Sequence, residues 1–229
     1  MKTVVFCGPS LDRSTLQRIT RADIANPIRR GNLDQWMEHD VFVILDGEFA
    51  QSLSVSPKEI LRALDAGKTV IGASSMGALR AAELSGYGMI GIGWIYNRFV
   101  HASVRREDDV ALTYSPVDFV AHTIPMVNVE YWLERLCADG DVSRRERAVI
   151  ARRARTIFYA ERTETKLLAA LEQTLGRSRL TTLLQETAGR IPDIKALDAE
   201  QAVVFADRLA RESSLPAPVI RHATLGMRG

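Results

Sequence analysis

The chain has few of the residues that form disulfides in secreted proteins or bind metals. It contains two cysteines, Cys7 and Cys137, and four histidines among 229 residues. The cysteines lie far apart and form no CxxC pair, so we expect no structural disulfide. The histidines are scattered and show no metal-ligand spacing. The sequence therefore predicts no disulfide scaffold and no metal site built on cysteine or histidine. The adjacent acids Asp108 and Asp109 leave a Mg²⁺ site open, although solvated loop acids are commoner.

Long hydrophobic runs are also missing. No apolar stretch is long enough to span a bilayer, and Met1–Gly8 is typical of a first strand rather than of a signal peptide. We therefore expect a cytoplasmic protein without a membrane partner. The net charge of +2 does not argue for nucleic acid. The arginine-rich segment 144–155 has no interleaved aromatic residues, so we expect a solvated face there and no nucleic-acid partner.

Three short apolar runs predict the strands of a parallel sheet. Thr3–Cys7, Val41–Leu45 and Thr69–Ala73 are nearly all apolar, which is typical of strands covered on both faces. Helical patterns alternate with them, at residues 10–22, 32–39 and 57–66. This alternation predicts an α/β fold, in which helices flank a parallel β-sheet in a Rossmann-like, doubly wound arrangement with a helical C-terminal extension.

The character of the chain changes after Pro125. Helical spacing continues through residues 129–138, 143–162, 163–175, 180–187 and 198–212, and Asp198 resembles the N-cap of the last helix. We expect three parts: an α/β core at 1–128, a helical part at 129–214 and a flexible tail at 215–229.

Residues 70–84 are the most informative segment. They read as a strand, a turn of small residues and a helix, with Ala73 two residues before Ser75 and Gly77 two residues after it. This spacing suits a nucleophile elbow, which exposes the serine hydroxyl above unpaired N–H groups that hold an oxyanion or an anion. It equally suits an N-capping serine, and Ser74 competes with Ser75 for either role.

The loops after the other strands add polar residues to the same site. Loops at the carboxyl ends of parallel strands meet at one edge of the sheet. Asp46 and Gly47 follow the second predicted strand, and Ser10 follows the first. Asp46 is a candidate base or orienting acid, with an Asx-turn as the structural alternative. We expect Ser10, Gly47, Ser74 and Gly77 to line a substrate site.

Two cationic residues complete the candidate set. Lys58 is a candidate base for Ser75 if it is buried, although the sequence alone favours an exposed first-turn lysine. Arg80 is a candidate clamp for a substrate carboxylate or phosphate, or it pairs with Glu83 three residues later. The candidate catalytic residues are Ser75, Asp46 and Lys58.

Several segments, in this order along the chain, resemble the TfuA-like core domain. They are residues 6–11, 45–49, 57–64, 72–84, 88–93, 108–111 and 127–128. The resemblance covers the N-terminal half of the chain, up to about Asn128. In one departure, Pro57 stands where relatives have a histidine before Lys-Glu, which shifts the role of base toward Lys58 or Asp46.

The resemblance implies an accessory protein of YcaO enzymes in the ATP-dependent thioamidation of a peptide backbone. It implies the release of sulfide from a thiocarboxylated ThiS-like sulfur carrier and help for YcaO in engaging its peptide substrate. A thiocarboxylate is an acyl compound, so its hydrolysis needs a nucleophile and stabilisation of an oxyanion, which the Ser75 turn would supply.

The sequence leaves three functions open. The first is a thiocarboxylate hydrolase with Ser75 as nucleophile, Asp46 and Lys58 as base or orienting groups, and Arg80 as anion clamp. The second is a non-catalytic adaptor that docks on YcaO and its peptide substrate through the basic helical half. The third, a nucleotide-binding domain, is disfavoured because the chain lacks a Walker A motif and a GxGxxG after its first strand. We therefore expect no cofactor.

Overall fold

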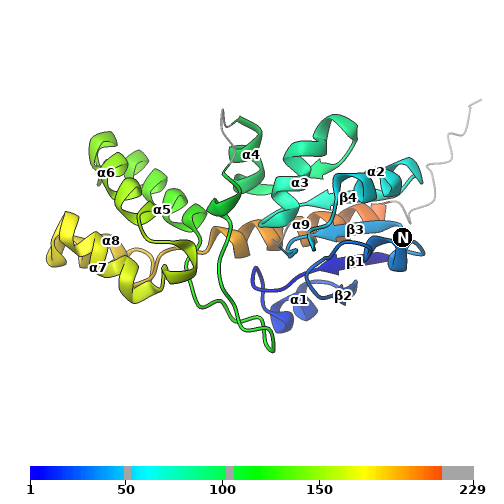
Figure 1. Cartoon of the computed structure of the whole chain (residues 1–229), viewed down its shortest axis with the longest axis horizontal. Helices are drawn as coiled ribbons and strands as arrows, with labels where there is room; N and C mark the ends of the chain where they lie inside the picture. The colour runs from blue at the N-terminus through cyan, green and yellow to red at the C-terminus, as the bar shows by residue number, and fades with distance from the viewer. Residues whose placement is uncertain (49–52, 102–105, 213–229) are drawn as a thin grey trace, which may run out of the picture.

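A parallel β-sheet forms the centre of the protein. The computed structural model describes residues 1–48, 53–101 and 106–212. Within them, five parallel strands form one sheet in the order β2-β1-β3-β4-β5 (Figure 1). The strands are β1 (Thr3–Phe6), β2 (Asp23–Ala25), β3 (Val41–Ile44), β4 (Thr69–Gly72) and β5 (Ile90–Gly91). The predicted α/β fold with a parallel sheet is confirmed.

The strand order places a switch point between β1 and β3. From β1 the chain crosses to β2 on one side and then returns to β3 on the other. Ligands of such sheets bind outside the carboxyl ends of the strands at this point. Phe6 pairs with Ile44, and Ile44 with Gly72, so the three central strands end at the same level. Their loops therefore meet at one edge.

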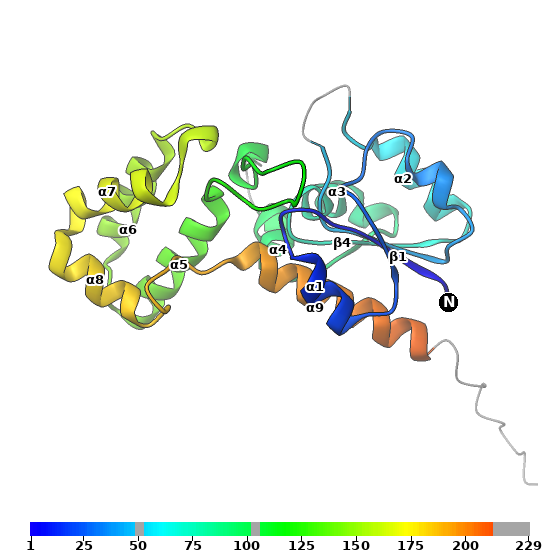
Figure 2. The ribbon, with the colours of Figure 1, turned by 90° about the horizontal axis from the view of Figure 1, so that it is seen from below.

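Helices cover both faces of the sheet because alternate strand residues point to opposite sides. Val5, Val43 and Ile71 face one layer, whereas Phe42 and Ile44 face the other. Figure 2 shows the two layers on opposite sides of the strands. The first layer holds α1 (Arg13–Ile19) and α9 (Ile194–Glu212), and the second holds α2 (Pro57–Asp65) and α3 (Met76–Leu84), followed by α4 (Gly93–His101).

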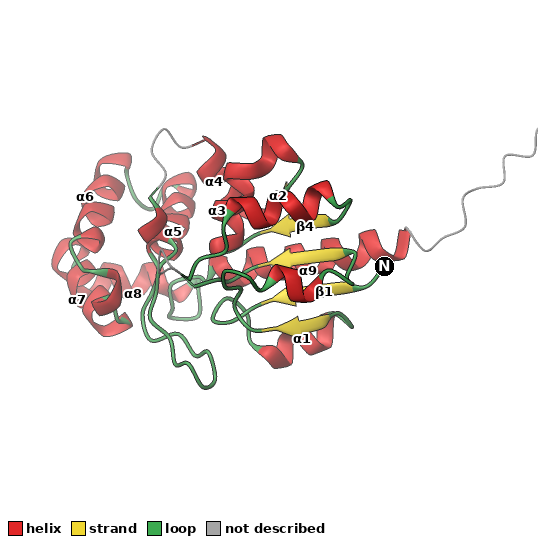
Figure 3. Ribbon diagram, turned by 45° about the vertical axis from the view of Figure 1, so that its right-hand side comes forward, coloured by secondary structure: helices red, strands yellow, loops and turns green. Residues whose placement is uncertain are grey.

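Four helices form a separate hydrophobic core, which we call the helical lobe. Trp132, Leu133, Ile150, Leu167 and Leu171 are buried in it. Figure 3 shows this lobe beside the edge to which the strands point. Its helices are α5 (Met126–Asp139), α6 (Arg144–Arg155), α7 (Glu164–Leu175) and α8 (Arg177–Gln185). After the lobe, α9 returns to pack against β1 and β3.

Some local predictions are wrong. The helix expected at 32–39 is only a 3-10 turn at Leu33–Trp36, and the helix expected at 143–162 ends at Arg155. The three predicted strands do not include β5, which is only two residues long because α4 begins at Gly93. The helix expected from 198 begins at Ile194, so Asp198 is not its N-cap. Instead, Asp198 accepts hydrogen bonds from the backbone at the start of α4.

The tail expected at 215–229 lies outside the described residues. Among the residues that the structure describes, no helix has the length and apolar character needed to cross a membrane.

Candidate functional site

Asp46 ties together the loops that follow β1 and β3. Its side chain is buried, with 2% exposed. Oδ2 accepts hydrogen bonds from the backbone N–H groups of Gly8 and Ser10, both at 2.9 Å, and Oδ1 accepts one from the Ser10 hydroxyl at 2.6 Å. The Ser74 hydroxyl in turn donates to Ser10 Oγ at 2.7 Å. The structure therefore brings Ser10, Asp46 and Ser74 together at the sheet edge.

Lys195, near the start of α9, completes this cluster. The residue is 2% exposed, and its Nζ lies 3.8 Å from Asp46 Oδ1 and donates to the Val110 carbonyl at 3.3 Å. A buried lysine is rare unless it is paired, and Asp46 supplies the opposite charge. The ion pair thus places a cation at the same edge as the serines.

Sequence reasoning missed Lys195, although a signal was present. Lys195 is in phase with Ala199, Ala202 and Ala206, which form the buried stripe of α9. A charged residue in the apolar stripe of a helix has to meet a partner inside the protein. The identity of that partner depends on how α9 packs on the sheet, and the local sequence pattern carries no information about this packing.

Ser75 shares a small cavity with Asp46 and Lys195, which we call the chamber. Its volume is about 20 Å³, close to the space that one water molecule requires. Ser75 is 2% exposed, and within the described residues no hydrogen bond engages its hydroxyl. The remaining walls of the chamber are Pro9, Pro27, Gly47, Val110, Leu112 and Tyr114.

The expectation that Ser75 stands exposed at an open rim is wrong. Residues 110–123, which we call the strap, fold back on themselves through a bridge between Tyr114 and Ala121. Val110, Leu112 and Tyr114 of this strap form walls of the chamber. The strap therefore covers the edge of the sheet at which the loops meet.

The backbone amides at the turn also differ from the expectation. The N–H groups of Ser75 and Gly77 both donate to the Leu45 carbonyl, at 3.1 and 3.4 Å. These two groups are therefore engaged rather than available for an oxyanion or a bound anion, whereas the N–H of Met76, directly after Ser75, donates to no backbone carbonyl of the described residues. Lys195 is the group in the chamber that offers positive charge to a negatively charged substrate.

The two serines of the turn have different surroundings. Ser74 has a φ of 64°, the left-handed conformation that a sharp strand-to-helix turn demands. Its hydroxyl is used to hold Ser10. Ser75 has a φ of −111° and borders the chamber. Ser74 thus stabilises the turn through its hydrogen bond to Ser10, and Ser75 is the serine that a group bound in the chamber would contact.

Small residues are required here for close packing of α3 on the sheet. A Cβ atom at Gly77 would overlap the backbone carbonyl of Ile44, and one at Gly72 would overlap the carbonyl of Gly77. The first turn of α3 therefore lies directly against β3 and β4. Gly77 acts through this contact, and it is absent from the walls of the chamber.

Lys58 and Arg80 are not part of the cluster. Lys58 is exposed on the first turn of α2, so the burial that its role as a base requires is not found. Arg80 donates from Nε to the Val55 carbonyl at 3.0 Å and pairs with Glu83 at 2.8 Å. Arg80 thus fixes the segment before α2 to α3, and the pairing with Glu83 is confirmed.

Two titratable groups beside Asp46 stay protonated at neutral pH. Burial, together with the charge of Asp46, raises the pKa of the Cys7 thiol well above its ordinary value, so Cys7 is no ready nucleophile. Burial also raises the pKa of Tyr114, helped by Glu48 and Asp46. Tyr114 therefore remains a hydrogen-bond donor at the wall of the chamber.

The adjacent acids Asp108 and Asp109 have different environments. Asp109 is buried and pairs with Arg155 of α6, which also contacts Glu130 at 3.0 Å. This ion-pair network ties the residue before the strap to the helical lobe. Asp109 is therefore used by an arginine, which removes it from the acids free to hold Mg²⁺.

Comparison with known proteins identifies the family of this chain. A search of the curated proteins finds no match. The family model described as TfuA-like protein matches residues 46–163, slightly more than half of the chain. The matched range contains Asp46, Ser75 and the strap, whereas Ser10 and Lys195 lie outside it. The resemblance read from the sequence is thus confirmed, and this chain belongs to the TfuA-like family.

Proposed function

We propose that this chain is an accessory protein of YcaO-dependent peptide thioamidation that releases sulfide by hydrolysing a thiocarboxylated ThiS-like carrier. Membership of the TfuA-like family supports the accessory role alongside YcaO-type proteins. One observation supports the chemistry: Ser75, Asp46 and Lys195 line the same chamber at the switch point of the sheet. A hydroxyl, a carboxylate and an ammonium group in one enclosed space suit acyl transfer from an anionic donor.

In the proposed first step, Ser75 Oγ attacks the carbonyl carbon of the thiocarboxylate. A carbon–oxygen bond forms, the carbon–sulfur bond breaks, and the sulfur leaves as hydrosulfide. Lys195 gives a proton to the leaving sulfur and recovers one from the serine hydroxyl. In the second step, water hydrolyses the acyl-serine ester to a carboxylate, a proton and free Ser75. Asp46 holds the Lys195 side chain in place while it gives up and regains its proton.

The strap has to move for this reaction. A thiocarboxylate group needs more room than the chamber provides, so Leu112 and Tyr114 must shift outward. The strap is braced from within, because the N–H of Ser115 donates to the Val120 carbonyl and that of His122 to the Thr113 carbonyl. It can therefore move as a unit without losing its own hydrogen bonds.

The test measures sulfide released from a thiocarboxylated carrier by the purified protein. We expect Ser75→Ala and Lys195→Met to abolish release while circular dichroism shows an intact fold. The exposed residues Ser85 and Lys58 provide matched controls, and S85A and K58M should release sulfide at the wild-type rate. Wild-type rates in folded S75A and K195M would remove the proposed mechanism.

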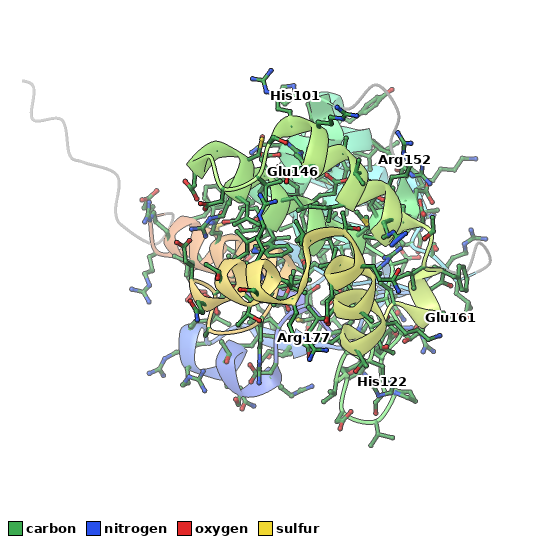
Figure 4. All side chains as sticks on the ribbon, turned by 90° about the vertical axis from the view of Figure 1, so that its left-hand side faces the viewer. His101, His122, Glu146, Arg152, Glu161 and Arg177 are labelled. Atoms are coloured by element: carbon green, nitrogen blue, oxygen red, sulfur yellow. The ribbon has the colours of Figure 1, made fainter. Side chains whose placement is uncertain are left out.

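A second candidate, the non-catalytic adaptor, is favoured by α6. The exposed residues Arg144, Arg145 and Arg152 form no ion pair within the described part of the chain, and Val149 between them is 47% exposed. Figure 4 shows Arg152 at the surface of the helical lobe. Unbalanced positive charge around an exposed apolar residue suits an acidic protein partner.

A pull-down with YcaO tests this second candidate. For an adaptor, the charge reversals Arg145→Glu and Arg152→Glu together should abolish binding and thioamidation. Arg177→Glu is the control, because Arg177 lies on α8 and is already paired with Glu172. Unchanged YcaO binding by the double variant would exclude α6 as the docking surface. Sulfide release by the same variant shows separately whether the chamber is intact.

A further inference from the structure

A larger cavity of about 370 Å³ lies between the strap and the helical lobe. We call it the α5–α9 cleft, and its walls include Ala121 and His122 of the strap, Asn128 of α5, Arg190, Asp193 and Lys195. Its volume falls within the range of about 300–1,000 Å³ that is typical of ligand sites. The cleft thus has the size of a binding site, and only a few of its wall residues belong to the loops at the edge of the sheet.

The cleft adjoins the chamber at Lys195. Pro9, Leu112 and Lys195 line both cavities, so a group that reaches the inner end of the cleft meets the buried ammonium. Another cavity, of about 530 Å³, lies on the other side of the strap near Trp36 and shares Pro27 and Tyr114 with the chamber. An anion approaching through this Trp36 pocket meets no cation at the junction. Arg13 and Arg29 line the Trp36 pocket, and Glu164 and Asp193 line the cleft, so the overall charge of the walls does not favour the cleft. The position of Lys195 at the shared end does favour the α5–α9 cleft as the way in for a negatively charged end group.

Asn128 gives an independent sign of a ligand in the cleft. It is 6% exposed, and its Nδ2 donates to Asp193 Oδ1 at 3.2 Å, while its Oδ1 has no hydrogen-bond partner in the described residues. A buried polar atom without a partner costs about 1–3 kcal/mol. An N–H donor from a ligand would remove this cost, and an extended peptide carries such donors along its backbone.

We propose that the α5–α9 cleft binds the extended carboxyl-terminal tail of the sulfur carrier. The terminal group reaches Lys195, and a backbone N–H of the tail meets the Asn128 amide oxygen. This inference rests on the proposed function for the identity of the tail. It also gives the helical lobe a role, because Asn128 of α5 and the residues that precede α9 form one wall of the cleft.

Binding of an unreactive tail tests the cleft without any chemistry. The probe is a fluorescent synthetic peptide with the sequence of the carrier tail and an ordinary terminal carboxylate. Ala121→Trp fills the cleft from the exposed strap, and we expect a Kd at least about tenfold higher. Gln35→Trp is the matched control, since Gln35 is exposed and lines the Trp36 pocket. Wild-type affinity in A121W, or equal weakening in Q35W, would overturn the proposal.

Sulfide release separates this inference from the proposed function. With thioacetate as a small thiocarboxylate, A121W should lose less activity than it loses with the thiocarboxylated carrier. Equal losses with both substrates would contradict a cleft that holds the tail. If the wild-type protein released sulfide from neither substrate, the hydrolase would be wrong, and peptide binding would still decide whether the cleft holds a tail.

Discussion

Asp46 and Lys195 lie far apart in the sequence and form a buried ion pair, with Oδ1 and Nζ 3.8 Å apart. The pair is asymmetric. Asp46 also accepts hydrogen bonds from two backbone N–H groups, from the Ser10 hydroxyl and, at 3.8 Å, from the Cys7 thiol. Within the described residues, Lys195 has one further acceptor, the carbonyl of Val110. Loss of its partner therefore leaves Lys195 with fewer stabilising contacts than the same loss leaves Asp46.

This asymmetry predicts unequal effects of the two substitutions on stability. Asp46→Asn leaves a buried ammonium group without its counterion, and breaking a buried pair in this way costs about 3–5 kcal/mol. Lys195→Met keeps most of the side-chain volume and leaves Asp46 with its other hydrogen-bond donors, so we expect a clearly smaller loss. Urea unfolding of both variants measures the difference. A larger loss in K195M than in D46N would contradict the asymmetry.

The two serines of the turn should separate stability from activity. Ser74→Ala removes the hydrogen bond to Ser10, which is worth about 1 kcal/mol, and should leave most of the sulfide release. Ser75→Ala removes a hydroxyl that holds nothing in the described structure, so the free energy of unfolding should change by less than about 1 kcal/mol. Its sulfide release should fall by about 10³-fold or more, as expected for a lost nucleophile.

Unfolding curves and sulfide assays on the same two preparations decide this prediction. Loss of activity in S74A with an active S75A would move the nucleophile to the neighbouring serine. Two active variants would point instead to water as the nucleophile in the chamber.

Burial on both faces explains why β1, β3 and β4 could be predicted. Each is a nearly all-apolar run, and the loops that follow them hold Asp46 and the serines. The edge strand β2 has one exposed and two half-buried residues and no such run, so its sequence carries no comparable pattern.

The covered site could not be predicted for a different reason. The strap has no periodic pattern that shows where it lies, and Lys195 reaches Asp46 only because α9 returns to the sheet after the helical lobe. Both features depend on tertiary packing. Local sequence could show that Lys195 is buried, but not that Asp46 is its partner.

The close contact of α3 with β3 predicts intolerance of a methyl group at Gly77. The Cβ of Gly77→Ala would overlap the backbone carbonyl of Ile44, which cannot move without disturbing the sheet. We expect a loss of at least about 3 kcal/mol in the free energy of unfolding. Gly86→Ala is the control, because open space surrounds Gly86, and its effect should stay within about 1 kcal/mol. A stable G77A would show that α3 can shift away from β3.

Asp198 joins α9 to the start of α4, because its two oxygens accept hydrogen bonds from the N–H groups of Trp94 and Ile95 at 2.9 and 2.8 Å. Burial raises the pKa of Asp198 to about 6, although these two hydrogen bonds oppose the shift. In the unfolded chain the pKa returns to about 3.9. The folded state therefore binds this proton more tightly than the unfolded state does.

The raised pKa of Asp198 predicts that the free energy of unfolding decreases as the pH rises. Between about pH 4 and pH 6 the folded protein holds more protons than the unfolded chain, so the free energy of unfolding falls through this window, by about 3 kcal/mol in total. Asp198→Asn has no proton to lose here. The substitution therefore removes the contribution of this position to the pH dependence, and the lost acceptor lowers the free energy of unfolding by a similar amount at every pH. Urea unfolding from pH 4 to pH 7 should therefore show a smaller decline in D198N than in the wild type, and equal declines would mean that the buried carboxylate keeps its ordinary pKa.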